Sequence, residues 1–129
     1  IALVTCLALV LYLVMGLRVS GARYKFKIEA PATTGHPEFE RHFRVQMNTL
    51  EWLPIFLPTL WLSAFYWGDR IAALVGVIWI VGRALYMFGY VSNPKGRAVG
   101  FSIQALAGLV LLVAAIAGAV RALIATGGV

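Results

Sequence analysis

The sequence predicts an all-α membrane protein, a bundle of four transmembrane helices. It has 129 residues, of which 61% are hydrophobic and only 12% charged, with a mean hydropathy of +0.87. About a quarter of a soluble domain is charged, so this composition excludes an ordinary soluble enzyme. The net charge of +6 sits beside apolar runs, which indicates membrane topology and an anionic ligand rather than nucleic acid. The length predicts one domain over residues 1–129.

The first predicted helix covers about residues 1–18. Residues 1–17 are nearly all apolar, which is close to the shortest run that spans a bilayer. The run contains no acidic residue. A basic stretch, RVSGARYKFKIEA, follows it and leads to PATTGHP at residues 31–37, a clear loop signal.

The second predicted helix covers about residues 37–66. Pro37 suits its first turn, and the two glutamates after it suit the positive end of the helix dipole. At about 1.5 Å per residue this helix is roughly 45 Å long, enough to project beyond the bilayer. Pro54 and Pro58 lie inside it, and in a bundle they more often kink a helix than end it.

The third and fourth helices are predicted over about 70–91 and 97–124. Turn sequences at 67–69 and 92–96 precede them, and two glycines follow the last one. Ala114, Gly118 and Ala122 form a row of small residues that favours close helix packing. Four crossings place both termini on the same side of the membrane.

The distribution of basic residues predicts the orientation of these crossings. Eight flank the 1–2 and 3–4 connections, and two flank the other side. The positive-inside rule therefore places both basic connections in the cytoplasm. The eight are Arg18, Arg23, Lys25, Lys27, Arg41, Arg44, Lys95 and Arg97, and the two are Arg70 and Arg121.

A polar row on the second helix leads from the basic end into the apolar run. Arg41, Arg44, Asn48 and Glu51 are three or four residues apart, so at about 100° per residue they share one face. Gln46 points to nearly the opposite side. An interfacial anchor would explain the first arginine, but it explains Asn48 and Glu51 poorly because they lie deeper.

The third helix carries a second polar row, at the same predicted membrane depth. Arg83, Tyr86 and Tyr90 are at positions i, i+3 and i+7, and Arg97 begins the next helix. An excess of arginine with one carboxylate and two phenols suits a small, multiply charged anion that also carries an amine. A structural network in which Arg83 and Glu51 neutralise each other is the alternative.

These segments resemble a known family. The run FERHFRVQMNTLE at 39–51, RALYMFGY at 83–90 and Arg97 seven residues later are similar to the membrane-associated proteins in eicosanoid and glutathione metabolism (MAPEG), above all to its leukotriene C synthase and microsomal glutathione transferase branches. The resemblance runs from about Arg18 to Ala125. It implies homotrimers of four-helix subunits that bind glutathione between neighbouring subunits, on the cytoplasmic side.

The resemblance also implies roles for individual residues. Arg97 would activate the thiol of glutathione, and the thiolate would attack a lipophilic electrophile that arrives from the bilayer between helices one and four of adjacent subunits. Neither a metal nor a general base on the protein is required. Arg23 and Gln46 would reach the glutathione from a neighbouring subunit. The residues expected to hold it from the first subunit are Arg44, Asn48, Glu51, Tyr86, Tyr90 and Arg97.

Two positions depart from the family pattern. Tyr24 stands where the synthases carry a second arginine proposed to act on their epoxide, and Trp52 stands where a glutathione-contacting tyrosine is usual. A general detoxifying transferase or a glutathione-dependent peroxidase therefore fits better than a specialised synthase.

Two other readings remain open at this stage. A small multidrug exporter of this length would need an acidic residue inside a membrane helix, usually the first, to exchange protons for cations. A non-catalytic, lipid-binding member of the same family is the other. A metal site is not expected, since His36 and His42 are six residues apart without a cysteine partner.

Overall fold

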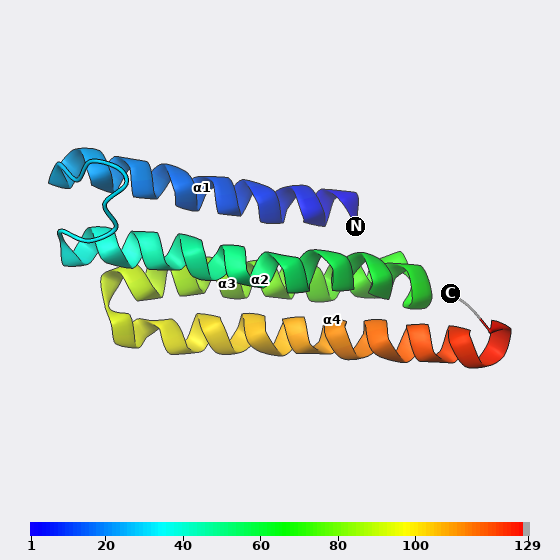
Figure 1. Ribbon diagram of the computed structural model, residues 1–129. Coiled ribbons are helices and arrows are strands. Elements are labelled where there is room, and N and C mark those ends of the chain that lie inside the picture. Colours follow the sequence, from blue (N-terminus) through cyan, green and yellow to red (C-terminus); the bar gives the residue numbers. More distant parts are fainter. Residues whose placement is uncertain (128–129) are drawn as a thin grey trace.

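Four long helices make up most of residues 1–127, and this confirms the predicted all-helical class. The computed structural model describes residues 1–127 and their side chains, except that of Pro94. In chain order the elements are α1 (Ala2–Phe26), α2 (Pro37–Trp67), α3 (Asp69–Ser92), the short 3-10 helix η1 (Pro94–Gly96) and α4 (Arg97–Thr126). The helices lie side by side and alternate in direction, so the α1–α2 and α3–α4 connections meet at one end of the bundle (Figure 1).

The first helix is longer than the sequence suggested. We expected it to end near residue 18, but α1 continues to Phe26 and ends at Lys27, which adopts the left-handed conformation with φ 55°. The added turns are stabilised by packing, because Val19 and Ala22 are buried against Phe39 in the first turn of α2. The apolar run alone could not show this contact. The other three long helices begin and end within two residues of the expected positions.

The start of α2 has the features that the sequence indicated. The Nδ1 atom of His36, the N-cap residue, accepts a hydrogen bond of 3.1 Å from the backbone N–H of Glu38, and Pro37 occupies the first helical position. Pro54 and Pro58 lie inside a helix that continues through both. The helix therefore runs without a break for 31 residues. Its first half is polar and its second half is apolar.

Close packing between α3 and α4 holds the end of α3 and the start of α4 together, and the candidate site lies at these two helix ends. Gly100 of α4 lies directly against the backbone of Tyr86 in α3, and a β-carbon added at Gly100 would collide with the Tyr86 nitrogen. Deeper in the bundle, the rings of Phe56 and Trp79 stack with centroids 3.9 Å apart. Glycine at position 100 thus allows the first turns of α4 to approach the polar face of α3.

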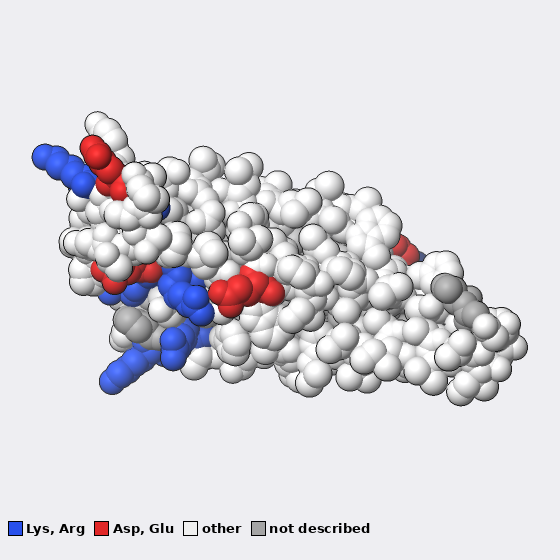
Figure 2. Space-filling model, viewed as in Figure 1, with Lys and Arg blue, Asp and Glu red and all other residues white. Residues whose placement is uncertain are grey.

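Three helices, α1, α3 and α4, are long and apolar enough to cross a membrane. Many of their large apolar side chains point outward, including Leu13, Leu74 and Leu106, each more than 60% exposed. Such a surface suits lipid rather than water. On the face shown in Figure 2, the Lys and Arg side chains gather at the end of the bundle that holds the α1–α2 and α3–α4 connections. The protein is therefore an integral membrane protein, while a crossing by α2 stays a prediction.

Candidate functional site

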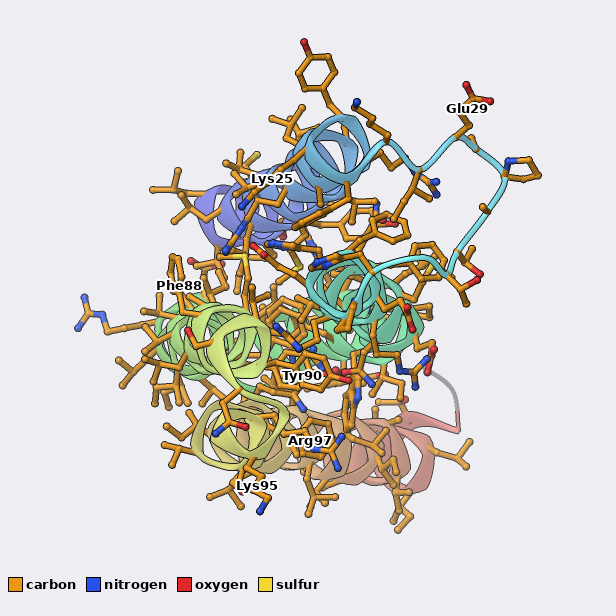
Figure 3. All side chains as sticks on the ribbon, turned by 90° about the vertical axis from the view of Figure 1, so that its left-hand side faces the viewer. Lys25, Glu29, Phe88, Tyr90, Lys95 and Arg97 are labelled. Carbon is orange, nitrogen blue, oxygen red and sulfur yellow. The ribbon has the colours of Figure 1, made fainter. Side chains whose placement is uncertain are left out.

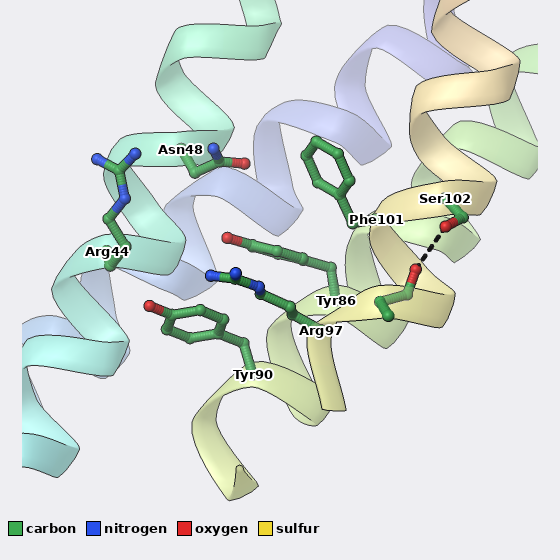
Figure 4. A pocket seen from close by; sticks show the side chains of 8 residues that line it. Arg44, Asn48, Tyr86, Tyr90, Arg97, Phe101 and Ser102 are labelled. Atoms are coloured by element: carbon green, nitrogen blue, oxygen red, sulfur yellow. Dashed lines mark hydrogen bonds between the residues drawn. The ribbon is translucent and has the colours of Figure 1, made fainter. Parts of the chain in front are cut away.

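A pocket of about 440 Å³ opens at the basic end of the bundle, between α2, the end of α3 and the start of α4 (Figure 4). Its volume is within the range of about 300–1,000 Å³ that is usual for small-molecule sites. Five of the eight residues around it belong to the set expected from the sequence. The lining consists of Arg44, Asn48, Tyr86, Tyr90, Arg97, Ala98, Phe101 and Ser102.

One wall of the pocket joins two phenol rings to a guanidinium group. The Tyr86 and Tyr90 rings stack with centroids 5.6 Å apart. The guanidinium carbon of Arg97 lies 5.9 Å from the centroid of Tyr90, and the Arg97 side chain points into the same pocket as the two phenols (Figure 4). An arginine held over an aromatic face keeps its charge and its free N–H donors. Arg97 can therefore stabilise an anion inside the pocket.

The opposite wall comes from α2. Arg44 and Asn48 are one turn apart and line the pocket together. Glu51 is two turns from Arg44, and its Oε1 atom lies 3.3 Å from the Arg44 Nη1 atom. Both side chains are about half exposed, so this carboxylate remains accessible to a positively charged group of a ligand.

Arg83 lies behind the pocket and is completely buried. Its Nη2 atom donates a hydrogen bond of 2.7 Å to the Asn48 Oδ1 atom, and its Nη1 atom donates one of 3.2 Å to the Thr49 hydroxyl. No ion pair joins Arg83 to a carboxylate within residues 1–127. The sequence left open a direct neutralisation of Arg83 by Glu51, and the structure shows that Glu51 pairs with Arg44 instead.

Three of the expected residues do not line this pocket: Glu51, which borders it through its ion pair with Arg44, and Arg23 and Gln46, which lie farther away. Arg23 donates a hydrogen bond of 2.7 Å to the carbonyl of Ala32 and lies over the Phe39 ring, in the α1–α2 connection. Gln46 is on the other side of α2, where a methyl group added at Gly16 of α1 would lie 3.1 Å from its Nε2 atom. The predicted contact of Arg23 and Gln46 with a ligand held by a neighbouring subunit stays a prediction.

Three lining residues on α4 were missing from the expected set. Phe101 lies one turn after Arg97, and Ser102 lies one turn after Ala98, so the four residues form two adjacent rows on α4. Their spacing was the available signal, but small and apolar residues in an apolar helix did not stand out. Trp52 packs edge-on against Phe101 with ring centroids 6.0 Å apart. The indole therefore lies beside the pocket wall, although it is not part of the lining.

Viewed along the bundle from its basic end, Tyr90 and Arg97 project into the space between α2, α3 and α4, whereas Lys25 and Phe88 lie on another side, where α1 faces α3 (Figure 3). Tyr24, which follows Arg23 on α1, is 90% exposed. The pocket offers cationic and phenolic donors on two walls and one carboxylate beside them. This combination suits a small anionic ligand with an amine, and a nucleophile that reacts as an anion.

Comparisons with known proteins show the family to which this chain belongs. The model of the MAPEG family matches residues 1–117. An uncharacterised protein of Synechocystis sp. is 49% identical over 115 residues, which cover 89% of this chain and 84% of that protein. Human microsomal glutathione S-transferase 2 is 47% identical over 98 residues, covering 74% and 67%. Guinea pig (Cavia porcellus) leukotriene C4 synthase is 37% identical over 118 residues, covering 92% and 79%.

Proposed function

Because this chain belongs to the MAPEG family, we propose that it is a membrane-bound glutathione transferase that activates the glutathione thiol and conjugates it to a lipophilic electrophile. The relatives named as a glutathione transferase and as leukotriene C4 synthase support a membrane enzyme that uses glutathione. The observation that carries the proposal is the place of Arg97, whose guanidinium shares a pocket with Tyr86 and Tyr90 and faces Arg44 and Asn48.

The chemistry requires a thiolate. A thiol has a pKa of about 8.5 and reacts as its anion. A guanidinium within hydrogen-bonding distance of the sulfur stabilises that anion, and each unit of lowered pKa corresponds to about 1.4 kcal/mol. In the proposed reaction the thiol proton leaves to water, the sulfur of the thiolate forms a bond to the electrophilic carbon, and the leaving group departs with its electron pair. Arg97 is the proposed catalytic residue.

The remaining polar groups would hold the tripeptide. Glutathione carries two carboxylates and one amine, which matches an excess of arginine beside a single carboxylate. We assign the amine to Glu51 and a carboxylate to Arg44, with further contacts from Asn48, Tyr86 and Tyr90. The lining of the pocket supports these assignments for all but Glu51, which lies next to it through its pair with Arg44.

A second subunit is part of the proposal. Arg23 and Gln46 lie away from the pocket of their own chain, so a role for either in binding requires a neighbouring copy. We propose a homotrimer with glutathione bound between subunits. The electrophile would then reach the thiolate between α1 of one subunit and α4 of the next, where apolar side chains face outward.

We further propose that α2 also crosses the membrane, which gives four crossings in total. It runs antiparallel to α1 and α3 along the length of the bundle (Figure 1). Its apolar second half reaches the level of the other spans, and its polar first half lies at the basic end. By the positive-inside rule the pocket faces the cytoplasm and both ends of the described chain lie on the opposite side.

The departures at Tyr24 and Trp52 favour a general transferase over a specialised synthase. A glutathione-dependent peroxidase is the companion activity: the thiolate would attack the terminal oxygen of a lipid hydroperoxide and release the lipid alcohol, and a second glutathione would convert the resulting sulfenic acid to the disulfide and water. An exporter is disfavoured, since α1 carries no acidic residue and the pocket contains two arginines that would repel cations. A non-catalytic lipid-binding scaffold would lack turnover, so a direct assay separates it from the enzyme.

The test is conjugation of glutathione to a chlorinated nitrobenzene by the purified protein in detergent or lipid. The proposal expects turnover by the native protein and its loss in Arg97→Ala, with glutathione binding largely retained. Arg121→Ala is the matched control, because Arg121 lies over Trp67 at the other end of the bundle. A native protein that binds glutathione but conjugates nothing would favour the scaffold.

A further inference from the structure

In the hydrogen bond between Arg83 and Asn48, the arginine must be the donor. A guanidinium carries N–H donors and no acceptor. The Asn48 atom 2.7 Å from Arg83 Nη2 must therefore be the amide oxygen. With its oxygen turned toward α3, the asparagine keeps its two N–H donors for another partner. Asn48 lines the pocket, and within residues 1–127 its amide nitrogen donates no hydrogen bond.

Arg83 is itself held rigidly in this position. The side chain is fully buried, and its guanidinium carbon lies 4.6 Å from the centroid of the Tyr86 ring and 5.7 Å from that of Trp79. The hydroxyl of Thr49 donates to the Val45 carbonyl, so its lone pairs are free to accept from Arg83. Contacts on several sides leave the guanidinium little freedom to release Asn48.

Burial of the charged Arg83 side chain inside the bundle costs free energy. This arginine lies nine residues before the end of α3, about 13 Å along the helix axis. No carboxylate within residues 1–127 pairs with it, and its Nε atom lacks a hydrogen-bond partner among them. A charged group at such a depth usually serves a site rather than stability, because a well-packed apolar residue would often be equally stable.

From these contacts we infer that Arg83 is a positioning residue that turns the Asn48 amide so that only its N–H donors face the pocket. The ligand group at Asn48 is therefore an acceptor, a carbonyl or carboxylate oxygen. The inference rests on the proposed use of glutathione, whose two peptide carbonyls and two carboxylates are groups of this kind. Arg83 acts through Asn48 and does not itself touch the ligand.

Glutathione binding to Asn48→Asp, measured by calorimetry in detergent, is the most direct test. Aspartate has the same shape, accepts from Arg83 at least as well, and offers no donor to the pocket. The dissociation constant should rise at least about tenfold, while the thermal midpoint stays level or rises. An affinity within about twofold of the native value would show that the pocket receives an acceptor from Asn48, and would overturn the inference.

Removal of the arginine gives an independent readout. Arg83→Met retains the length of the side chain and suits an apolar interior. It should raise KM for glutathione about fivefold or more and leave kcat at saturating glutathione near the native value. In an Asn48→Ala background the same change should add less than about twofold, because the residue through which Arg83 acts is gone. Equal effects in both backgrounds would contradict the positioning role.

Thr49→Val is the matched control, since it removes the other hydrogen bond of Arg83 and leaves Asn48 intact. Its KM should stay within about twofold of the native value, whatever happens to stability. A merely structural arginine would predict similar KM values for Arg83→Met, Thr49→Val and the native protein. If the native protein itself failed to bind glutathione, the proposed function would fail. If the native protein bound glutathione and the variants bound it equally well, only the positioning role of Arg83 would fail.

Discussion

Arg44 and Glu51 form an ion pair across two turns of α2, with 3.3 Å between Nη1 and Oε1. We assign these two side chains to groups of opposite charge on glutathione, and in the structure they pair with each other. The pair is about half exposed, and such pairs contribute only about 0–1 kcal/mol. A ligand with both an amine and a carboxylate can therefore replace it at little cost, whereas a ligand with only one of them leaves one partner without compensation.

This pair leads to a prediction about the amine of glutathione. The native protein should prefer glutathione over an analogue without the amino group by about tenfold, because Glu51 accepts from the ammonium. Glu51→Gln should reduce that preference to about twofold or less. Competition binding with the two tripeptides measures it. A preference that persists in the variant would assign the amine to another residue.

Arg44→Ala should weaken binding rather than chemistry. The side chain lines the pocket across from Arg97, and loss of a charge-assisted contact to a carboxylate costs about 1.5–3 kcal/mol. We expect KM for glutathione to rise at least about tenfold with kcat much less affected. Steady-state kinetics with glutathione as the varied substrate give both numbers, and an unchanged KM would remove Arg44 from the site.

The close approach of α3 and α4 can be tested at Gly100. A β-carbon at this position collides with backbone atoms of Gly82, Leu85 and Tyr86, and backbone cannot move aside as a flexible side chain can. Gly100→Ala should therefore lower the thermal midpoint and weaken glutathione binding, since Arg97 begins the same helix. Circular dichroism during heating and calorimetry provide the two measurements.

Gly21→Ala is the control for this change. A β-carbon at Gly21 meets no atom within 4 Å, and alanine in a helix is favoured over glycine by about 1 kcal/mol. This variant should keep or raise the thermal midpoint and bind glutathione as the native protein does. If Gly100→Ala were equally well tolerated, the contact between Gly100 and Tyr86 would not be what positions α4.

The sequence was sufficient to locate the helices, but it did not show which residues contact one another between helices. Apolar runs and turn residues located α2, α3 and α4, and helical spacing gathered Arg44 and Asn48 on one face. The end of α1 was wrong because it depends on packing against Phe39, which is a tertiary contact.

Spacing along one helix also could not decide which charges pair between helices. The sequence suggested the carboxylate of Glu51 as the structural partner of Arg83, although the amide of Asn48 lies on the same face of α2. The structure selects Asn48. Phe101 and Ser102 were missed for a related reason, since only the neighbouring helices turn that side of α4 into a pocket wall.

The central claim is that Arg97 stabilises the thiolate of bound glutathione, and ultraviolet difference absorbance of the thiolate titrates this directly. With the native protein saturated in glutathione, the apparent pKa of the thiol should fall at least about one unit below its ordinary value of about 8.5. In Arg97→Ala, with glutathione still bound, it should return to about that value. The same titration midpoint in both proteins would contradict the account.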